Sequence, residues 1–479
     1  MSAIAVPALP RPQRRRSGRS WRARAGVGVA GLALVAAAVG QPAAASPPPP
    51  TPPPTAGTGT FVYVANNGGD NVLVIDTATH TVVDSLGIGD GNSGPSGLAV
   101  SPDGTRVFVA DTESDSMSVI FPAARLSGST SVGQNPLGVA SGPDSHRAYV
   151  TNNLSNNMTV VDTQTVPFEV LDTVHVGTRP YDVAVSPNGT RAYVANQLDN
   201  AVAVVDLTTN PPSLVVSVQV GQFPQGVAVS PDGASVYVTN FVDGTLSVIR
   251  TADNTVRATV NLGQNTSPSD VAVTPDGSRV YVTDFGTRAV SVIDATANPP
   301  SVLHTVLVGR ESEGVAVTPD GSEVYVTNSG DNTVSVIATA SDTVTHTIPG
   351  FNNPLGVGAG TRTVGSAPVR LTLEEEADEG HGKDSPDARR HPGFTLSARL
   401  TADGGPLDGR TLIFGTGSKA LCTQTTDGRG RATCAVPPGR PDGEGCYTAT
   451  FAGDRSHAAA TARLCTKHDG PPEDRHSHR

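Results

Sequence analysis

Tyr149-Val-Thr-Asn152, Tyr237-Val-Thr-Asn240 and Tyr325-Val-Thr-Asn328 are three copies of one short segment, in which an apolar stretch ends in a polar amide. Four near variants begin at Tyr63, Phe108, Tyr193 and Tyr281. Successive copies are therefore 45, 41, 44, 44, 44 and 44 residues apart. A period of this length is typical of the four-stranded blades of a β-propeller. The seven quartets predict an all-β fold with a seven-bladed propeller.

One period shows how each blade is expected to form. Residues 270–277 (DVAVTPDG) begin with an apolar inner strand and end in a β-turn, where proline presets φ and Gly277 closes the turn. Three more strands are predicted at 279–283, 289–294 and 301–308. Five other periods carry a related Pro-Asp or Pro-Asn turn. These turns mark one end of each blade.

The inner strands repeat a small residue at one position. It is Ala99, Ala140, Ala184, Ala228, Ala272, Ala316 and, in the last copy, Gly358. Because blades converge on a central axis, the least room is left there, and a small side chain fits. The repeat opens with a second-position strand at 61–66 and ends with an unpartnered inner strand at 355–359. We expect these two to pair and to close the ring, which leaves no open edge between the first and last blades.

These quartets resemble those of the YVTN family of β-propeller repeat proteins, over residues 61–360. The resemblance implies an exported or surface-layer protein, similar in outline to seven-bladed lactonase-like propellers. It implies no shared set of catalytic residues.

The polar residue that ends each quartet could be imagined as one of a ring of ligands. These residues are Asn66, Asp111, Asn152, Asn196, Asn240, Asp284 and Asn328. Asn and Asp often bond their own backbone two residues on and so start a turn. We therefore expect them to be structural.

Functional residues should depart from the repeat, at the start of the inner strands and in the loops after the quartets. On blades four to seven such residues are Arg179, Tyr181, Asp182, Phe223, Gln225, Phe241, Asp270, Phe285, Arg288, Arg310, Glu311 and Glu313. Blades one to three depart less from the repeat, and Ser96 and Leu137 occupy the matching positions there. Exposed aromatic side chains among charges of both signs are typical of binding hot spots. We expect a ligand or partner surface here, against the alternative of ordinary variation in solvated loops.

Asp182, Asp270 and Glu313 also allow an enzymatic interpretation. At the mouth of the channel they could form a divalent-ion site or serve as acid and base. The propeller sequence contains no cysteine, no Gly-x-Ser-x-Gly and no His-Glu-x-x-His. Its histidines are expected on turns or outer strands: His80, His146, His175, His304 and His346. We therefore assign no catalytic residue, metal or cofactor, and a lactonase-like or other hydrolase is the second hypothesis.

The first 45 residues have the pattern of a signal peptide, with an arginine-rich start, an apolar stretch and Ala43-Ala44-Ala45 before the expected cleavage site. A proline-rich linker follows at 46–60. The signal contains seven of the 33 basic residues and no acidic one, so 26 basic and 44 acidic side chains remain, a formal net charge of about −18. This charge disfavours nucleic acid as a partner. The apolar stretch is short for a membrane span, so no stable span is expected after cleavage.

A second folded unit is predicted over residues 366–467. About seven short segments separated by turn signals are typical of an immunoglobulin-like β-sandwich. Residues 446–454 (CYTATFAGD) resemble the late strand of bacterial Ig-like repeat domains, which implies an adhesive or spacer module. The polar tail at 468–479 is predicted to be disordered.

All four cysteines lie in this unit, which with the signal indicates an oxidising compartment. Three pairings are possible. We favour Cys422 with Cys434 and Cys446 with Cys465, because each pair is nearly symmetric about a turn. The alternative of a metal site lacks a Cys-x-x-Cys pair.

Together these features predict a secreted or cell-surface bacterial protein that is monomeric, and they favour a noncatalytic role over an enzymatic one. It would present a propeller face to a cell-envelope or extracellular protein, a glycan or a small ligand.

Overall fold

The computed structural model describes residues 57–88, 93–123, 126–364, 369–377, 394–402, 405–417, 419–436, 444–452 and 460–467. The predicted signal peptide, most of the linker and the predicted C-terminal tail lie outside these ranges. Within them no helix is both long and apolar enough to span a bilayer.

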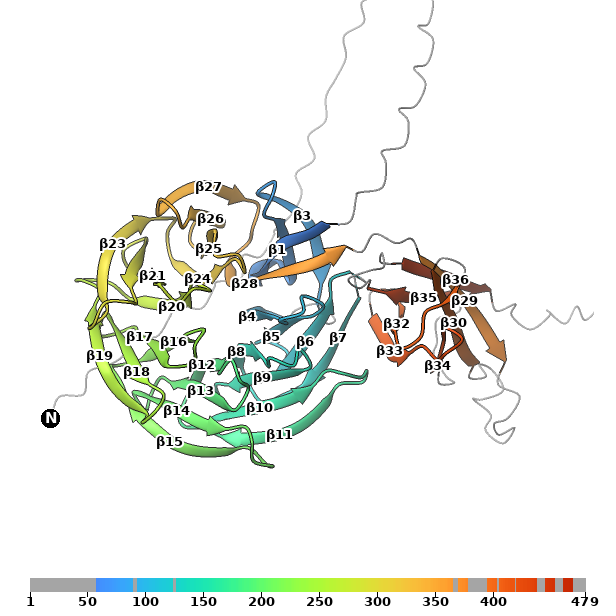
Figure 1. The fold of residues 1–479 in the computed structure, drawn as a ribbon, viewed down its shortest axis with the longest axis horizontal. Helices are drawn as coiled ribbons and strands as arrows, with labels where there is room; N and C mark the ends of the chain where they lie inside the picture. The colour runs from blue at the N-terminus through green and yellow to red at the C-terminus, as the bar shows by residue number, and fades with distance from the viewer. Residues whose placement is uncertain are drawn as a thin grey trace, which may run out of the picture. The chain divides into compact units, whose positions relative to one another are not determined.

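Residues 57–364 form seven antiparallel sheets of four strands, arranged around a central axis (Figure 1). The first blade contains β28 (Pro354–Val364), β1 (Gly57–Asn66), β2 (Asn71–Asp76) and β3 (Thr81–Gly87), with a 3-10 turn at Asn67–Gly69. The second contains β4 (Pro95–Val100), β5 (Val107–Asp111), β6 (Ser116–Phe121) and β7 (Leu126–Ser131). The third contains β8 (Pro136–Ser141), β9 (Arg147–Asn152), β10 (Asn157–Asp162) and β11 (Glu169–His175).

The four remaining blades keep the same strand order from the axis outward. The fourth contains β12 (Pro180–Val185), β13 (Arg191–Asn196), β14 (Ala201–Asp206) and β15 (Ser213–Gln219). The fifth contains β16 (Pro224–Val229), β17 (Ser235–Asn240), β18 (Thr245–Arg250) and β19 (Thr255–Asn261). The sixth contains β20 (Pro268–Val273), β21 (Arg279–Asp284), β22 (Ala289–Asp294) and β23 (Ser301–Leu307). The seventh contains β24 (Ser312–Val317), β25 (Glu323–Asn328), β26 (Thr333–Ala338) and β27 (Thr343–Pro349).

Ring closure follows the sequence prediction. Strand β28 pairs antiparallel with β1, with Tyr63 opposite Gly358 and Gly57 opposite Val364. The first blade is therefore assembled from both ends of the repeat region. The paired segment is longer than predicted, because β1 begins at Gly57 and β28 continues to Val364.

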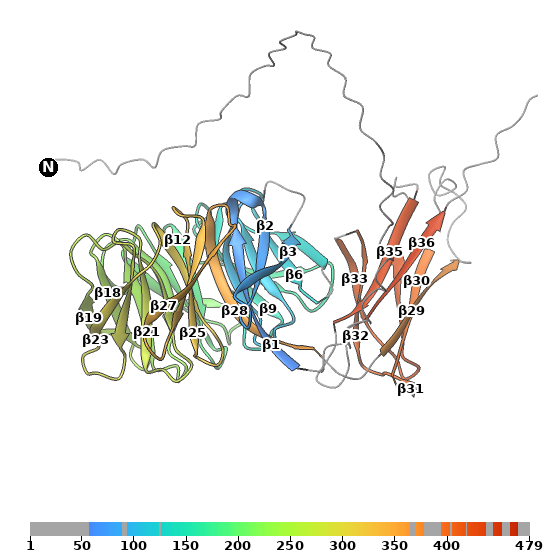
Figure 2. The ribbon, with the colours of Figure 1, turned by 90° about the horizontal axis from the view of Figure 1, so that it is seen from above.

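Apolar clusters hold the ring together, one at each junction of neighbouring blades among the described residues. The aromatic residue of every quartet is nearly or fully buried in one of these clusters. Burying an aromatic side chain removes a large apolar surface from water, so each quartet contributes to the packing of two blades. Figure 2 shows the ring from its side, with the blades packed face to face.

The threonine of the quartet links two blades through its hydroxyl group. Thr327 Oγ1 donates a hydrogen bond to the Leu355 carbonyl of the next blade (2.6 Å) and accepts one from the Gly314 backbone N–H (2.8 Å). Thr151, Thr239 and Thr283 make the equivalent bond to the next blade. Variant quartets with alanine at this place lack the hydroxyl.

The last residue of the quartet is structural, but its predicted bond to its own backbone is wrong. Asn240 Nδ2 donates to the hydroxyls of Thr245 and Ser247, both at 2.9 Å, and its Oδ1 accepts from the Gly221 backbone N–H at 3.1 Å. The buried amide thus joins the third strand to the loop that leads into its own blade. Asn328 forms the same arrangement, and Asn152 does so with the Asn157 Oδ1 atom in place of the first hydroxyl.

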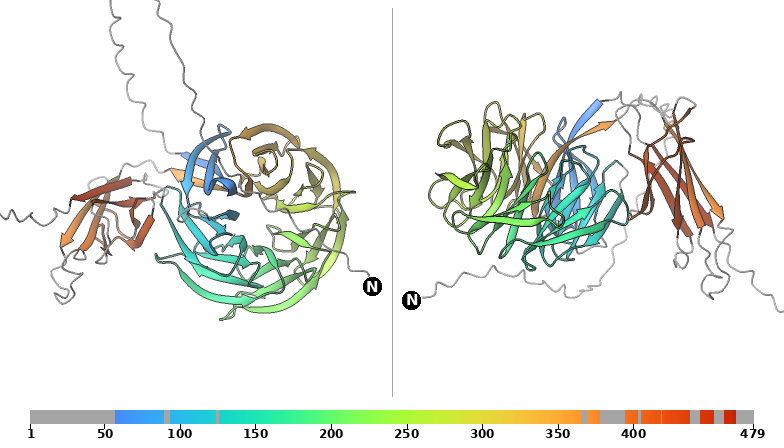
Figure 3. Two further views of the ribbon diagram at one scale, coloured as in Figure 1. Left: turned by 180° about the vertical axis from the view of Figure 1, so that it is seen from behind. Right: turned by 60° about the horizontal axis from the view of Figure 1, so that its bottom comes forward.

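The C-terminal module consists of two antiparallel sheets. One contains β36 (Ala460–Lys467), β35 (Glu444–Phe451), β32 (Thr411–Thr416) and β33 (Lys419–Thr425). The other contains β29 (Val369–Ala377), β30 (Phe394–Ala402), β31 (Gly405–Pro406) and β34 (Arg431–Val436). Figure 3 shows these strands in two layers, and one apolar cluster contains residues of both. This is a β-sandwich, and its relation to immunoglobulin-like domains stays a prediction.

The two favoured disulfides are confirmed. Cys422 bonds to Cys434, and Cys446 bonds to Cys465, which lies opposite it in the β35/β36 pair. No free cysteine remains.

Candidate functional site

A recurring backbone irregularity sets the direction of the residues at the mouth of the channel. In blade four the register between β12 and β13 shifts between Pro180 and Val183, so Tyr181 and Asp182 have no regular partner on β13. The same shift occurs between Pro268 and Val271 in blade six, and between Ser312 and Val315 in blade seven. Such bulges turn side chains out of the regular alternation of a strand. They explain why the variable residues of the repeat gather at one end of the channel.

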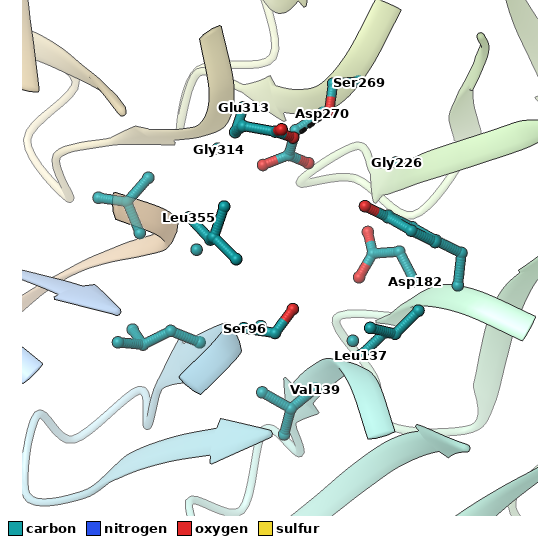
Figure 4. Close-up of a pocket in the computed structure, with 16 residues that line it drawn as sticks. Ser96, Leu137, Val139, Asp182, Gly226, Ser269, Asp270, Glu313, Gly314 and Leu355 are labelled. Atoms are coloured by element: carbon teal, nitrogen blue, oxygen red, sulfur yellow. Dashed lines mark hydrogen bonds between the residues drawn. The ribbon is translucent and has the colours of Figure 1, made fainter. Parts of the chain in front are cut away.

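The gathered residues line a cavity of about 280 Å³ at the axis (Figure 4). Its lining includes Tyr181, Asp182, Asp270 and Glu313, which the sequence singled out. The other lining residues are Ser96, Gly97, Leu98, Leu137, Gly138, Val139, Gly226, Ser269, Gly314, Leu355, Gly356 and Val357. The three carboxyl groups therefore share one cavity, as expected. Ser269, Val139 and Leu355 were missed as lining residues, although they occupy repeat positions at the start of the inner strands.

One position near the start of the inner strand is occupied by only two residue types. It is Gly in five blades and Asp in the other two, at Asp182 and Asp270. A Cβ atom on Gly97 would lie 2.2 Å from the Leu137 carbonyl oxygen of the next blade, and one on Gly356 would lie 2.4 Å from the Ser96 carbonyl oxygen. Atoms cannot approach so closely, so Gly97 and Gly356 are required where the backbones of their blades meet those of the next blade.

The two aspartates turn this inter-blade contact into a hydrogen bond. Asp182 Oδ2 accepts from the Val227 backbone N–H at 3.0 Å, and Asp270 Oδ2 accepts from the Val315 backbone N–H at 2.9 Å. Both donors belong to the inner strand of the following blade. The Asp270 Oδ1 atom also accepts from the Val271 N–H at 2.7 Å. These carboxyl groups are thus fixed in position as well as facing the cavity.

Burial changes the ionisation of all three acidic side chains. Burial raises the pKa of Glu313 to about 7. The hydrogen bond that the Ser269 hydroxyl donates to Glu313 at 3.1 Å lowers this pKa, but its effect is smaller than that of burial. Burial likewise raises the pKa values of Asp182 and Asp270 well above the ordinary range of aspartate, and the charge of Asp270 adds to the shift at Asp182. Desolvation disfavours the charged form of a carboxyl group. At neutral pH this cavity is therefore able to hold protons as well as negative charge.

Tyr181 lines the cavity beside these acids. Burial, followed by the negative charges of Glu313, Asp182 and Asp270, raises the pKa of Tyr181 far above that of a free phenol, so the hydroxyl stays protonated. Among the described residues this hydroxyl has no hydrogen-bond partner. It is available as a donor or acceptor to a bound molecule.

Three phenylalanines form a row on the same side of blades five and six. The ring centroids of Phe223 and Phe241 are 6.3 Å apart, and those of Phe241 and Phe285 are 6.2 Å apart. All three side chains are half-buried rather than exposed, which corrects the sequence expectation. Phe223 precedes β16 by one residue, and Gly226 of that strand lines the cavity. We call Phe223, Phe241 and Phe285 the aromatic row.

Two of the three arginines of the predicted surface make contacts away from the cavity. Arg179 Nη1 donates to Asn153 Oδ1 at 2.8 Å, and Arg310 Nε donates to Asp331 Oδ1 at 2.6 Å. Both partners follow a quartet, so these pairs tie together loops of the ring. Arg288 and Glu311 are exposed, and Gln225 is buried. None of these five residues lines the cavity.

The described side chains do not support the divalent-ion interpretation. No three His, Cys, Asp or Glu residues among them converge as ligands of a metal ion would. The histidines lie in turns or outer strands, as predicted: His304 is in β23 and His346 in β27. His80 stacks on His346 and contacts Glu323 Oε1 at 2.8 Å.

Solved structures share the propeller fold at low sequence identity. Hydrazine synthase of Kuenenia stuttgartiensis is 23% identical over 54% of this chain and 87% of its own, with a TM-score of 0.50. A protein of unknown function from Desulfotomaculum acetoxidans is 18% identical over 63% of this chain and 98% of its own, with a TM-score of 0.54. A Bacteroides uniformis protein proposed to be a 6-phosphogluconolactonase is 14% identical over 63% and 99%, also with a TM-score of 0.54. At these identities the likeness shows the fold alone.

No curated protein matches the chain. The profile of the YNCE-like beta-propellers matches residues 97–357, which is more than half of the sequence. That segment runs from the inner strand of blade two to β28, so it covers six blades and the closing strand. The protein belongs to the YNCE-like β-propeller family.

Proposed function

We propose that this protein is a noncatalytic binding module that holds a ligand at the mouth of its central channel. The observation that carries the proposal is the cavity of about 280 Å³, which combines Tyr181 and three carboxyl groups with apolar walls. Small-molecule sites are typically concave, largely apolar and supplied with a few fixed polar groups. The bulged inner strands hold these groups in place before any ligand arrives.

The aromatic row would extend this site into a larger surface. Phe223, Phe241 and Phe285 are half-buried and contact one another, so they present a rigid apolar face at small conformational cost. Such side chains are frequent anchors in interfaces with proteins. A cell-envelope or extracellular protein or a glycan could therefore bind across the row while a smaller group enters the cavity.

A panel of neutral sugars, amines and carboxylates, together with an extract of the native envelope, would test this function. We expect at least one component to raise the melting temperature of the wild type or to be retained by it. The triple variant Y181A/F241A/F285A should lose this effect, whereas Leu214→Ala on the exposed outer strand β15 should keep it. Equal binding by wild type and triple variant would contradict the proposal.

A hydrolase acting at the same cavity is the second candidate. The hydrogen bond from Ser269 to Glu313, together with the pKa of Glu313 near 7, is what a hydroxyl beside a general base requires. Hydrolysis of simple lactones and esters by wild type, Asp270→Ala and Glu313→Gln would decide it. Turnover that both substitutions abolish would establish the enzyme, and turnover that neither changes would remove this cavity from the reaction.

We further propose that the protein acts outside the cytoplasm. Its two disulfides fit an extracellular protein, because such bonds persist in oxidising compartments. The C-terminal β-sandwich would then serve as an adhesive or spacer module. Detection of the protein in cell-surface and culture-medium fractions, with the disulfides intact, would check this.

A further inference from the structure

The cavity at the channel mouth has charge of only one sign. Among the described residues, the titratable side chains of the lining are Tyr181, Asp182, Asp270 and Glu313, and none is Lys, Arg or His. We infer that the cavity takes an organic ammonium ion, a small amine whose cationic end meets the carboxyl groups and whose body is apolar. This inference rests on the proposed function and names the chemical class of its ligand.

The acidic side of the cavity is formed by blades four, six and seven. Figure 4 shows the carboxyl groups of Asp182, Asp270 and Glu313 directed toward the central space. Asp182 and Asp270 are held by backbone N–H groups of the next blade, and Glu313 by the Ser269 hydroxyl through Oε2 alone. No hydrogen bond to Glu313 Oε1 is formed within the described residues. A buried carboxylate is costly unless it is paired, so a cation in this space would supply the missing partner.

The opposite side is apolar and comes mainly from blades one to three. Leu98, Leu137, Val139, Leu355 and Val357 line it, together with the Ser96 side chain. A bare metal ion would leave these surfaces without a partner, and the carboxyl groups do not converge on one point as metal ligands would. A molecule with a cationic end and a short hydrocarbon or aromatic body would contact both sides.

Tyr181 adds a third kind of contact. Its ring belongs to the lining, and aromatic faces attract ammonium groups through their negative quadrupole. Its protonated hydroxyl could also accept a hydrogen bond from an N–H donor. An anionic ligand, in contrast, would meet three acids and no positive charge, so phosphates and carboxylates are disfavoured.

Binding of a cation would be linked to pH. Burial raises the pKa values of Asp182, Asp270 and Glu313, the last to about 7, and the nearby charge of Glu311 contributes at Glu313. In the free protein these groups therefore retain protons that an ammonium ion must displace. Affinity should rise as the pH is raised from 5 to 8, and protons should be released on binding.

Three probes of one shape distinguish the ligand classes: phenethylammonium, the neutral 2-phenylethanol and the anionic 3-phenylpropionate. By isothermal titration calorimetry at pH 8, we expect the ammonium probe to bind at least about tenfold more tightly than either analogue. Asp182→Asn and Glu313→Gln should each weaken the ammonium probe about tenfold and leave the alcohol within about threefold. Asn at position 182 keeps an oxygen that can accept the hydrogen bond from the Val227 N–H, so the contact between blades four and five should be preserved. Leu214→Ala, on the exposed outer strand β15, is the control and should bind the ammonium probe as the wild type does.

The outcomes separate this inference from the proposed function. If the alcohol or the anion binds the cavity as tightly as the ammonium probe, the cavity is a binding site but the inferred class is wrong. If wild type binds no ammonium probe up to about 10 mM, the inference is also wrong, since even weak specific binding would be detected there. The proposed function fails only if the panel and the envelope extract also show no difference between wild type and the Y181A/F241A/F285A variant.

Discussion

The quartets and the starts of the inner strands are repeated equally often, yet they differ in what their regularity means. Quartet residues are buried between blades, where each aromatic ring, hydroxyl and amide has a fixed partner in the ring. The inner-strand starts keep glycine or aspartate where backbones meet, but the preceding residue varies among Ser, Leu, Tyr, Gln and Glu. Regularity thus marks contacts within the ring, whereas the variable residues line the cavity at the channel mouth, except for the buried Gln225.

Substitution of Gly97 by alanine should have the largest effect, because this position belongs to the channel mouth but is constrained like the quartets. The new Cβ would lie 2.2 Å from the Leu137 carbonyl oxygen, so two blades must move apart. We expect a loss of about 3 kcal/mol in the free energy of unfolding, measured with urea. Gly87→Ala is the control, since no atom lies within 4 Å of its Cβ position. Equal stability of the two variants would show that the glycine at position 97 is not constrained by the contact between blades.

Asp284→Asn should stabilise the propeller at alkaline pH. Burial raises the pKa of Asp284 from 3.8 to about 7, and its Oδ1 is buried without a hydrogen-bond partner. The folded state therefore holds a proton that the unfolded chain releases, so the contribution of this group to stability falls as pH rises from about 4 to 7. Asparagine has no such loss, and we expect a gain on the order of 2 kcal/mol at pH 8 and almost none at pH 4.

Chemical denaturation at both pH values would measure this effect. The reverse substitution, Asn240→Asp, should destabilise the protein more at pH 8 than at pH 4, because Asn240 lies fully buried at the equivalent place. If the gain in the free energy of unfolding from Asp284→Asn were the same at both pH values, ionisation of the Asp284 carboxyl group would not be its cause.

Thr327→Val should have a smaller effect. The substitution keeps the shape of the side chain but removes the hydroxyl that bonds to Leu355 and Gly314. We expect a loss of about 1 to 2 kcal/mol, since buried backbone groups lose a partner. Thr305→Val on the exposed strand β23 should change stability little. A shift in the thermal midpoint no greater than that control would argue against the inter-blade role of the quartet hydroxyl.

Phe241→Ala should have the smallest effect on stability and a clear effect on binding of a large partner. The ring is half-buried, and its aromatic neighbours among the described residues are Phe223 and Phe285. We expect a loss of about 1 kcal/mol, in contrast with the larger loss for an aromatic residue of a quartet. Thermal unfolding beside the envelope-binding assay would compare the two properties. If Phe241→Ala lost as much unfolding free energy as Phe108→Ala, the aromatic row would contribute to the stability of the ring as the quartets do.

Sequence alone predicted blade number and ring closure from periodic spacing, and it favoured the observed disulfide pairing among three possible ones. It also placed Asp182, Asp270 and Glu313 at the starts of inner strands, where they could form a site at the mouth of the channel, although they belong to blades four, six and seven and only the two aspartates occupy equivalent positions. It could not show that Asn240 bonds to residues five and seven positions later, because that contact depends on how the third strand packs. Arg179 and Arg310 were included in the binding surface for their charge, whereas contacts with Asn153 and Asp331 occupy them.

The pairing of β1 with β28 also has a mechanical consequence. The strands are antiparallel, and Gly57 lies opposite Val364, so the chain enters and leaves the propeller at the same end of this pair. Tension applied to both sides of the propeller would load the backbone hydrogen bonds one after another, as in unzipping, instead of all together, as in shear. The ring would then open first at the blade that both ends of the repeat region share, while six blades remain intact.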